Sequence, residues 1–440
     1  MILKRTLILI LLTLSTFALH AQRGTNSPYS YSGVGLLNHR AFYHQQFMGG
    51  TSRAFAHESS YSQANPASLA AIRYTTLELG ASLDLITQSS ADKEINSSNG
   101  KLGYFNMALP LLQYPGLAFS FGISPVSQVG YFQQNELLED SVDVLNSFEG
   151  RGGINSFNVG LGYEVVKGLS VGVNVDALFG NIVDIRDKQY VDNLDLFNYS
   201  DRIDANYSGL KWNFGVQYSG QIFKKLEHGF GLTFSPSSSL NARVDRHVVS
   251  YNSEGNAGFR IDSILSETDV KYELELPMGY GIAYRIGNPG KWMNSIEYAI
   301  DGFSDFSDIR GVSSYRDQEY IGFGGYFQPV DVAEMSRIRK LSDLLSVTRF
   351  YYGVSYTTSY LELYAEPITE FGMGFGLGIP VIKKVRMADG QNLQVTSRLN
   401  LGINYKIRGT TDNGLIEERI LELKAGMTLS DKWFNQRKYQ

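Results

Sequence analysis

The longest regular pattern in the chain is an alternation of apolar and polar positions over residues 270–286. Every second residue from Val270 to Ile286 is apolar or aromatic, and the positions between them carry charges, glycines, a proline and an alanine. A period of two is that of a β-strand, whose successive side chains point to opposite faces. The run is much longer than the usual strand of about 5–6 residues. It indicates either a large soluble sheet or the wall of a membrane barrel, with lipid outside and a wetter interior.

In a barrel wall the apolar face of this strand meets lipid, and the charged face lines the lumen. The lumen-facing candidates are Glu273, Glu275 and Arg285 of this strand, together with Arg398 and Lys406 of a later alternating stretch. We expect them to hold the contents of a hydrated lumen by salt bridges, although a ring that selects a substrate is the alternative. Pro277 cannot donate a ladder hydrogen bond, so it predicts a local break in the strand.

Similar alternation recurs from residue 74 to residue 430 and predicts about fourteen antiparallel strands, an even number as in bacterial outer-membrane barrels. Long polar stretches at residues 133–153 and 187–207 are interpreted as loops, and residues 360–366 as a short strand. The longest excursion, residues 307–346, is predicted to be an external loop. Apolar residues at helical spacing within it predict a helix over residues 332–345. Long and short connections alternate along most of the chain, which favours a transmembrane barrel over a soluble sandwich.

The first 73 residues do not alternate. Residues 1–21 have a basic start, an apolar core and small residues before Gln22, which predicts a secretory signal peptide. Residues 22–73 carry many aromatic and apolar groups, too many for a solvated linker. We expect them to fold as a hatch, or plug, inside the lumen. Residues 431–440 are predicted to form a periplasmic tail.

Composition narrows the possible chemistry. The net charge of -5 gives no basic footprint for nucleic acid, and cysteine is absent. His39 and His44 with Glu58 match no defined ligand spacing, so we expect no metal site and no cofactor. No catalytic motif is present, so we expect no enzyme activity. The glycine-rich stretches at residues 322–325 and 372–378 are interpreted as places where lumen contents approach the strands closely.

Several short motifs resemble the long-chain fatty acid transporter (FadL) family of outer-membrane barrels, in particular its Bacteroidetes-type branch. The motifs lie at residues 49–55, 278–285, 302–306, 370–372, 408–411 and 431–434, together with the turn Asn65-Pro66-Ala67. This resemblance implies a fourteen-stranded barrel closed by an N-terminal hatch, with Asn65, Pro66 and Ala67 forming the hatch turn. It also implies passive uptake of hydrophobic compounds.

Two functions from different classes remain open. The leading hypothesis is an outer-membrane FadL-like channel for passive uptake of small hydrophobic compounds such as fatty acids. The other is a non-transporting barrel that acts as a scaffold or subunit of a secretion or assembly complex, with the FadL-like barrel of the type IX secretion system as a precedent by resemblance. The expected partners are membrane lipids or lipopolysaccharide, a hydrophobic small-molecule ligand, and other outer-membrane or periplasmic proteins. The expected location is the outer membrane of a Gram-negative cell.

Overall fold

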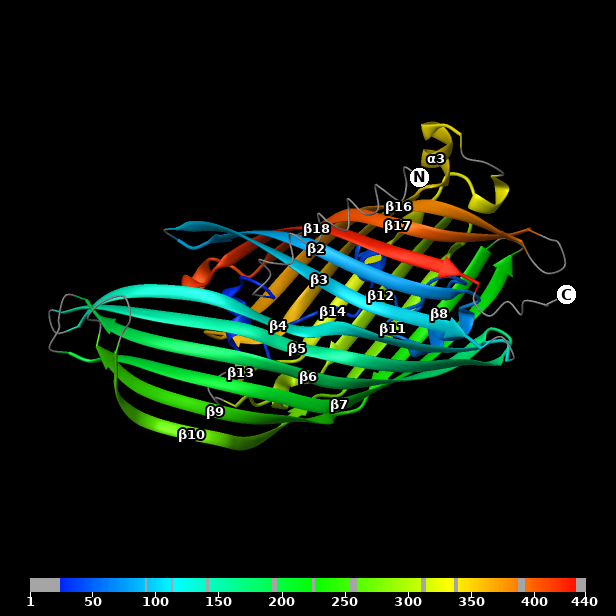
Figure 1. Cartoon of the computed structure of the whole chain (residues 1–440). Coiled ribbons are helices and arrows are strands. Elements are labelled where there is room, and N and C mark those ends of the chain that lie inside the picture. Colours follow the sequence, from blue (N-terminus) through cyan, green and yellow to red (C-terminus); the bar gives the residue numbers. More distant parts are fainter. Residues whose placement is uncertain are drawn as a thin grey trace.

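Most of the chain forms one antiparallel sheet that closes into a barrel (Figure 1). The computed structural model describes residues 24–91, 93–111, 114–139, 142–191, 196–223, 226–252, 259–309, 314–335, 339–386 and 392–432. The predicted signal peptide therefore lies outside the described residues, as does the predicted tail beyond residue 432. Within the described residues the wall has fourteen staves, as predicted, and β18 pairs with β2 to close it.

The staves are β2 (Thr75–Ser89), β3 (Glu94–Pro110), β4 (Leu117–Glu139), β5 (Val142–Val166), β6 (Leu169–Tyr190), β7 (Asn198–Phe223), β8 (Leu226–Ser235) with β9 (Ser238–Asn252), β10 (Phe259–Leu276) with β11 (Gly279–Asn288), β12 (Trp292–Asp301), β14 (Gln318–Phe327), β15 (Arg349–Leu363), β16 (Glu366–Arg386), β17 (Asn392–Arg408) and β18 (Glu417–Asp431). Shorter elements between them are η4 (Phe303–Asp305), the two-residue strand β13 (Ser314–Tyr315), η5 (Val332–Glu334), α3 (Leu341–Val347) and η6 (Asp412–Gly414). We call the end where β2 begins and β18 ends the proximal end, and the opposite end the distal end.

Two errors in the strand assignment cancelled in the predicted count. The predicted strand at residues 360–366 is the end of β15 and the start of β16, so it is not a separate stave. The predicted external loop at residues 307–346 contains β14, which was missed. Glycines and aromatic residues make up most of β14, and Ile321 is its only aliphatic residue, so the alternation is hard to see.

The predicted helix over residues 332–345 is also wrong in extent and in place. Among the described residues of this range, η5 and the start of α3 are helical, and they follow β14 at the proximal end, the same end as the last residue of β18 (Figure 1). Within the described residues, no helix has both the length and the apolar character needed to span a membrane.

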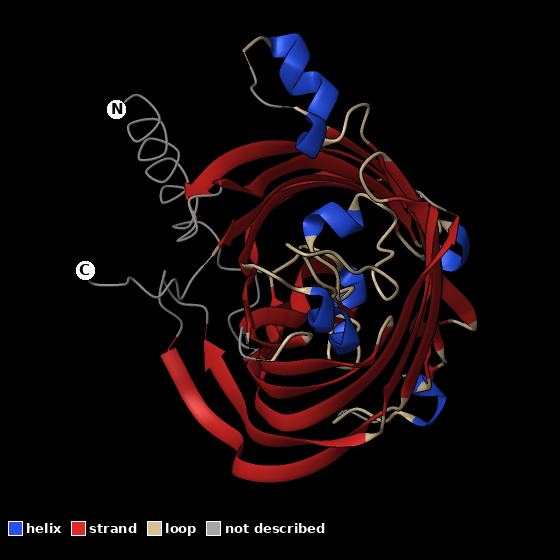
Figure 2. Cartoon of the chain, turned by 90° about the vertical axis from the view of Figure 1, so that its right-hand side faces the viewer, coloured by secondary structure: helices blue, strands red, loops and turns tan. Residues whose placement is uncertain are grey.

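The N-terminal residues lie inside the barrel. We call residues 24–73 the lumenal segment; it contains η2 (Pro28–Tyr31), β1 (Leu36–Leu37), α2 (Tyr43–Gln46) and η3 (Pro66–Ala71). Figure 2 shows short helices and loops surrounded by the ring of strands. The segment has its own apolar core, in which Phe42, Phe47 and Met48 are fully buried against wall residues such as Tyr326 and Tyr351.

The middle of the wall is apolar on its outer face. On β11, Tyr280 and Ile282 are about half exposed on the outer face. Ala283 and Arg285, at alternate positions of the same strand, are buried on the inner face. Neighbouring staves repeat this arrangement, for example with exposed Leu232 on β8. An outer apolar face with a polar inner face is the arrangement that a hydrocarbon environment requires of a barrel. We call this band the belt.

Beyond the belt the polarity is reversed. The distal parts of β4 to β7, with β9 and β10, extend past the other staves and form a structure that we call the crest (Figure 1). Here Leu274 and Leu276 are buried in an inner apolar cluster with Phe303 and Tyr360. The outer face of the crest is polar, as expected for a surface in water.

The long alternation at residues 270–286 therefore covers two faces. β10 ends at Leu276 and β11 begins at Gly279, so the break predicted at Pro277 is confirmed. The break shifts the alternation by one residue, and such a slip moves every side chain to the other face. Glu273 and Glu275 are consequently exposed on the outside of the crest, and their predicted lumen-facing position is wrong.

The neighbouring stave uses the same device. Pro236 and Ser237 separate β8 from β9. Phe234 is exposed on the outside of β8, whereas Leu240 and Ala242, an even number of residues further, are buried inside β9. Pro236 and Pro277, in neighbouring staves, thus mark the level at which the apolar face changes sides.

A pair of substitutions tests where the belt ends. Ile282→Arg places a charge on the outer face of the belt and should lower the free energy of unfolding by about 2–4 kcal/mol. Glu273→Arg, on the outer face of the crest in the same stave, should change it by less than about 0.5 kcal/mol. Unfolding in guanidinium, followed by tryptophan fluorescence in lipid vesicles, measures both. Equal losses would contradict the assignment of the two faces.

Candidate functional site

The lumenal segment is held against the wall at the turn Asn65-Pro66-Ala67. Asn65 caps η3, since its Oδ1 accepts a hydrogen bond from the Ala67 amide at 3.1 Å. Its Nδ2 donates to the Arg53 carbonyl at 2.7 Å and to the Val216 carbonyl of β7 at 3.2 Å. One buried amide thus joins the start of a short helix, a second loop of the segment and the wall.

Wall glycines allow the backbone of the lumenal segment to pack directly on the strands. A Cβ at Gly162 would lie 2.6 Å from the Pro66 carbonyl oxygen, and one at Gly374 would lie 2.8 Å from the Phe47 Cα. Such distances exclude any side chain, because backbone atoms cannot easily move away. The glycines at which a Cβ would lie within 3 Å of the segment's backbone or of the Asn65 side chain are Gly130, Gly162, Gly172, Gly215, Gly231, Gly322, Gly324, Gly353 and Gly374. They form a ring around the segment, which we call the glycine ring.

A buried ion pair fastens the loop before this turn. Glu297 of β12 is fully buried and forms a salt bridge with Arg53. Its Oε2 also accepts hydrogen bonds from the amides of Ser52 and Arg53, at 2.7 and 2.8 Å. The carboxylate is therefore satisfied entirely by the lumenal segment. Removing one member of a buried pair leaves an uncompensated charge and costs about 3–5 kcal/mol.

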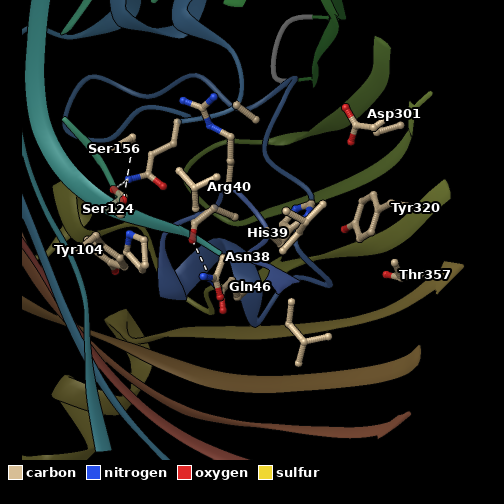
Figure 3. Close-up of a pocket in the computed structure, with 18 of the residues that line it drawn as sticks. Asn38, His39, Arg40, Gln46, Tyr104, Ser124, Ser156, Asp301, Tyr320 and Thr357 are labelled. Atoms are coloured by element: carbon tan, nitrogen blue, oxygen red, sulfur yellow. Dashed lines mark hydrogen bonds between the residues drawn. The ribbon is translucent and has the colours of Figure 1, made fainter. Parts of the chain in front are cut away.

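The lumen contains a cavity of about 330 Å³, lined by both the lumenal segment and the wall. Figure 3 shows Arg40, His39 and Asn38 of the segment on one side, with Tyr320 and Asp301 of the wall opposite. Its charged lining residues are Arg40, Arg53, Asp84, Lys101, Asp176, Lys211, Asp301, Glu370, Lys406, Arg408, Glu422 and Lys424. The lining also includes apolar side chains such as Leu178, Leu276 and Phe303, so the cavity presents both charged and apolar surfaces.

Ion pairs organise this charged lining. The Arg40 guanidinium is bidentate to Asp176 of β6, with N–O distances of 2.7 and 3.0 Å. On the opposite wall Lys406 Nζ lies 3.0 Å from Glu370, and Arg408 Nε donates to the same carboxylate at 2.9 Å. These pairs balance positive and negative groups within a space shielded from lipid.

Lys424 and Glu418 extend the network to the lumenal segment. Lys424 Nζ donates to Glu422 and to the Gln46 side chain, both at 2.6 Å. Glu418 accepts from Ser27 Oγ at 2.8 Å. Wall charges are therefore used to fix the segment as well as to satisfy one another.

The structure places the remaining predicted lumen residues as follows. Lys406 lies in the charged lining just described. Arg285 is buried and donates to Ser219 Oγ at 3.0 Å, and Arg398 is buried near the proximal end, where it donates to Gln328 at 3.4 Å. Arg285 and Arg398 therefore contact other groups than Lys406 does, and the three cations do not form one site.

The sequence did not single out Glu297, Glu418 and Lys424, which contact the segment, or Glu370 and Glu422, which pair with the cations of the same network. Each is an inward-facing charge in an alternating strand, so strand parity was the available signal. The sequence does not tell which of these charges face the lumenal segment, because that depends on how the segment folds.

Of the histidines of the lumenal segment, His44 is buried and His39 and His57 are half-buried. Burial lowers the pKa of His44 to about 3, and its Nε2 lies 3.2 Å from Ser60 Oγ. Burial likewise lowers the pKa of His39, whose Nε2 lies 2.9 Å from the Gly50 carbonyl oxygen. The two rings thus contact different groups. Among the described residues, no cluster of three or more His, Cys, Asp or Glu side chains is arranged to hold a metal ion.

Comparisons with known proteins agree with the fold. A family model described as BamG matches residues 1–440. The Ralstonia pickettii toluene transporter TbuX is similar in structure, with a TM-score of 0.56, 13% identity and coverage of 89% of this chain and 99% of that one. The P. putida toluene transporter TodX has a TM-score of 0.55 and 14% identity, with coverage of 91% of this chain and 100% of that one. A Pseudomonas aeruginosa FadL homologue has a TM-score of 0.51 and 11% identity, with coverage of 90% of this chain and 98% of that one. No curated protein matches the sequence.

At these identities the likeness establishes a shared fold, the fold implied by the resemblance to the FadL family. The Bacteroidetes-type branch stays a prediction.

Substitution within the glycine ring should loosen the lumenal segment. In Gly353→Ala the new Cβ would meet the backbone of Met48 and Gly49, so we expect a loss of about 1–3 kcal/mol and easier cleavage of the segment by added protease. Gly100→Ala is the matched control, because nothing lies within 4 Å of a Cβ at that strand position. Equal protease resistance in the two variants would argue against direct backbone packing.

The buried pair makes a second prediction. Glu297→Gln should cost about 3–5 kcal/mol, because Arg53 is then left unpaired, and the double variant Arg53→Met with Glu297→Leu should cost clearly less. Glu417→Gln removes the exposed partner of Arg419 and should cost at most about 1 kcal/mol. Guanidinium unfolding curves compare all three. A double variant at least as unstable as Glu297→Gln would contradict the role of the buried pair.

Proposed function

This chain belongs to the BamG family, and from that premise, together with its filled lumen, we propose that it is an outer-membrane barrel that works closed, as a scaffold or subunit of a larger assembly. The observation that carries the proposal is the attachment of the lumenal segment. The glycine ring and the buried pair of Arg53 with Glu297 fix it to opposite parts of the wall. A segment held in this way acts as part of the core.

The energetics of opening support a closed state. Displacing the segment would separate Arg53 from Glu297 and expose the apolar side chains of Phe47 and Met48. Breaking one buried pair alone costs about 3–5 kcal/mol. An apolar ligand gains about 25 cal/mol per Å² of buried surface, but only where the lining is apolar, and much of this lining is charged. Passage of a small apolar compound would therefore return little of the free energy that opening consumes.

The crest supplies a surface suited to a protein partner. β10 pairs with β9 along its length, whereas β12, the partner of β11, stops at Asp301 opposite Gly279. One edge of β10 therefore extends past the end of β12. Strand edges are sites at which another chain adds by main-chain hydrogen bonds. The polar outer face of the crest, with Glu273 and Glu275, would give such a contact its selectivity.

The second candidate function is passive uptake of small hydrophobic compounds such as fatty acids. It is favoured by the shared fold, because the structural neighbours TbuX and TodX are described as toluene transporters. The apolar cluster inside the crest, around Leu274 and Phe303, would then be the place at which a ligand first binds. In either case membrane lipids or lipopolysaccharide would surround the belt.

Purification from native membranes in mild detergent, followed by native mass spectrometry, separates the two functions. We expect the wild-type chain within a larger particle, and we expect the double variant Glu273→Arg with Glu275→Arg to be depleted from it. Lys383→Glu, an exposed change at the proximal end, is the control and should stay in the particle. Recovery only as a free monomer that binds fatty acid or toluene saturably would overturn the scaffold proposal.

A further inference from the structure

A second cavity lies at the proximal end of the lumen and has a different chemistry. It has a volume of about 400 Å³ and lies beside the turn before β12 and the residues after β14. Its polar lining includes Arg349, Arg398, Gln328 and His57. It takes no part in the contacts that fix the lumenal segment at the glycine ring.

Two arginines enter this cavity from strands on either side of β16. Arg349 starts β15 and pairs with Gly378, and Arg398 of β17 pairs with Pro380. The Tyr351 side chain packs on the inner face of β16 at Gly378. The two arginines are neighbours because both donate to Gln328 Oε1, and they are 6% and 9% exposed.

Neither arginine has an anionic partner among the described residues. Arg349 Nε and Arg398 Nη2 donate to the same amide oxygen, Gln328 Oε1, at 3.1 and 3.4 Å. Arg349 also lies over the Tyr326 ring, with 4.4 Å to its centroid, and its Nη2 is 3.3 Å from His57 Nε2. Arg398 Nη1 is buried and has no hydrogen-bond partner within the part of the chain that the structure describes.

The described surroundings offset this charge only in part: Asp331 interacts electrostatically with Arg398 but forms no ion pair with either arginine within 4 Å. Burial holds the pKa of His57 well below its usual value, so the imidazole is uncharged. Asp331 is the carboxylate that lines the cavity, and one of its oxygens accepts from the Ala333 amide at 2.9 Å as the cap of η5. Buried charges in proteins are normally paired, so two adjacent guanidinium groups with one idle N–H indicate a site for an anion.

We infer that this cavity binds a phosphate group between the guanidinium groups of Arg349 and Arg398. Guanidinium forks match the oxygens of phosphate in a bidentate manner. A phosphate monoester carries about −1.5 to −2 charges at neutral pH, which matches two arginines better than the single charge of a carboxylate. The phosphate comes either free from solution or on a lipid head group. The site does not depend on the proposed scaffold function.

Titration of the purified full-length barrel in detergent tests the site. The probes are inorganic phosphate and a short-chain phosphatidic acid, with sodium chloride at matched ionic strength as the blank, and isothermal titration calorimetry is the readout. We expect saturable binding of at least one probe, weakened about tenfold or more in Arg398→Gln. Arg285→Gln removes another buried arginine outside this cavity and should leave the affinity unchanged.

Arg398→Lys guards against misfolding, since it keeps the charge but loses the fork, and it should also weaken binding. Binding of inorganic phosphate identifies a free anion as sufficient, and binding of phosphatidic acid alone identifies a lipid head group. The inference is overturned if neither probe binds saturably. It is equally overturned if Arg398→Gln and Arg285→Gln bind with the affinity of the wild type.

Discussion

Direct packing of the lumenal segment on the glycine ring is the contact on which the rest of the structure depends. A barrel of this size leaves space inside, and the chain fills that space with its own first residues. Side chains on the inner face would hold those residues away from the wall. Glycines at positions such as Gly162, Gly353 and Gly374 bring the two backbones into contact. That approach then places Glu297 beside the amides of Ser52 and Arg53 and allows a fully buried carboxylate to be satisfied.

The wall has to meet two solvents, and it does so by changing the side on which its apolar residues lie. In the belt the apolar face is outside, and in the crest it is inside. Two adjacent staves make the change at Pro236 and at Pro277, where the ladder is interrupted. Since apolar residues stay at even positions on both sides of each break, the sequence shows one uninterrupted alternation. The crest can therefore stand outside the membrane with its own apolar core and a polar surface.

The sequence predicted the barrel, its strand number, the break at Pro277 and an interior filled by the N-terminal residues. These rest on local signals: strand period, proline chemistry and aromatic content. The sequence could not predict whether Glu273 and Glu275 lie on the inner or the outer face of the wall, because that depends on how the strand pairs with its neighbours. The polar stretches at residues 133–153 and 187–207, interpreted as loops, are strands over most of their length, since the outer face of the crest is polar. Arg349 gave no signal at all, because it lies at the start of a strand where no alternation precedes it.

Hydrogen–deuterium exchange of the intact protein in lipid nanodiscs tests most directly whether the lumen is closed by a fixed segment. The amides of Ser52, Arg53 and Ala67 donate to Glu297 or Asn65 deep inside the barrel. We predict that they exchange as slowly as the amides of the wall strand β16. Exchange at the rate of an unstructured peptide, with the wall still protected, would show that the segment leaves the lumen readily and would contradict a closed barrel.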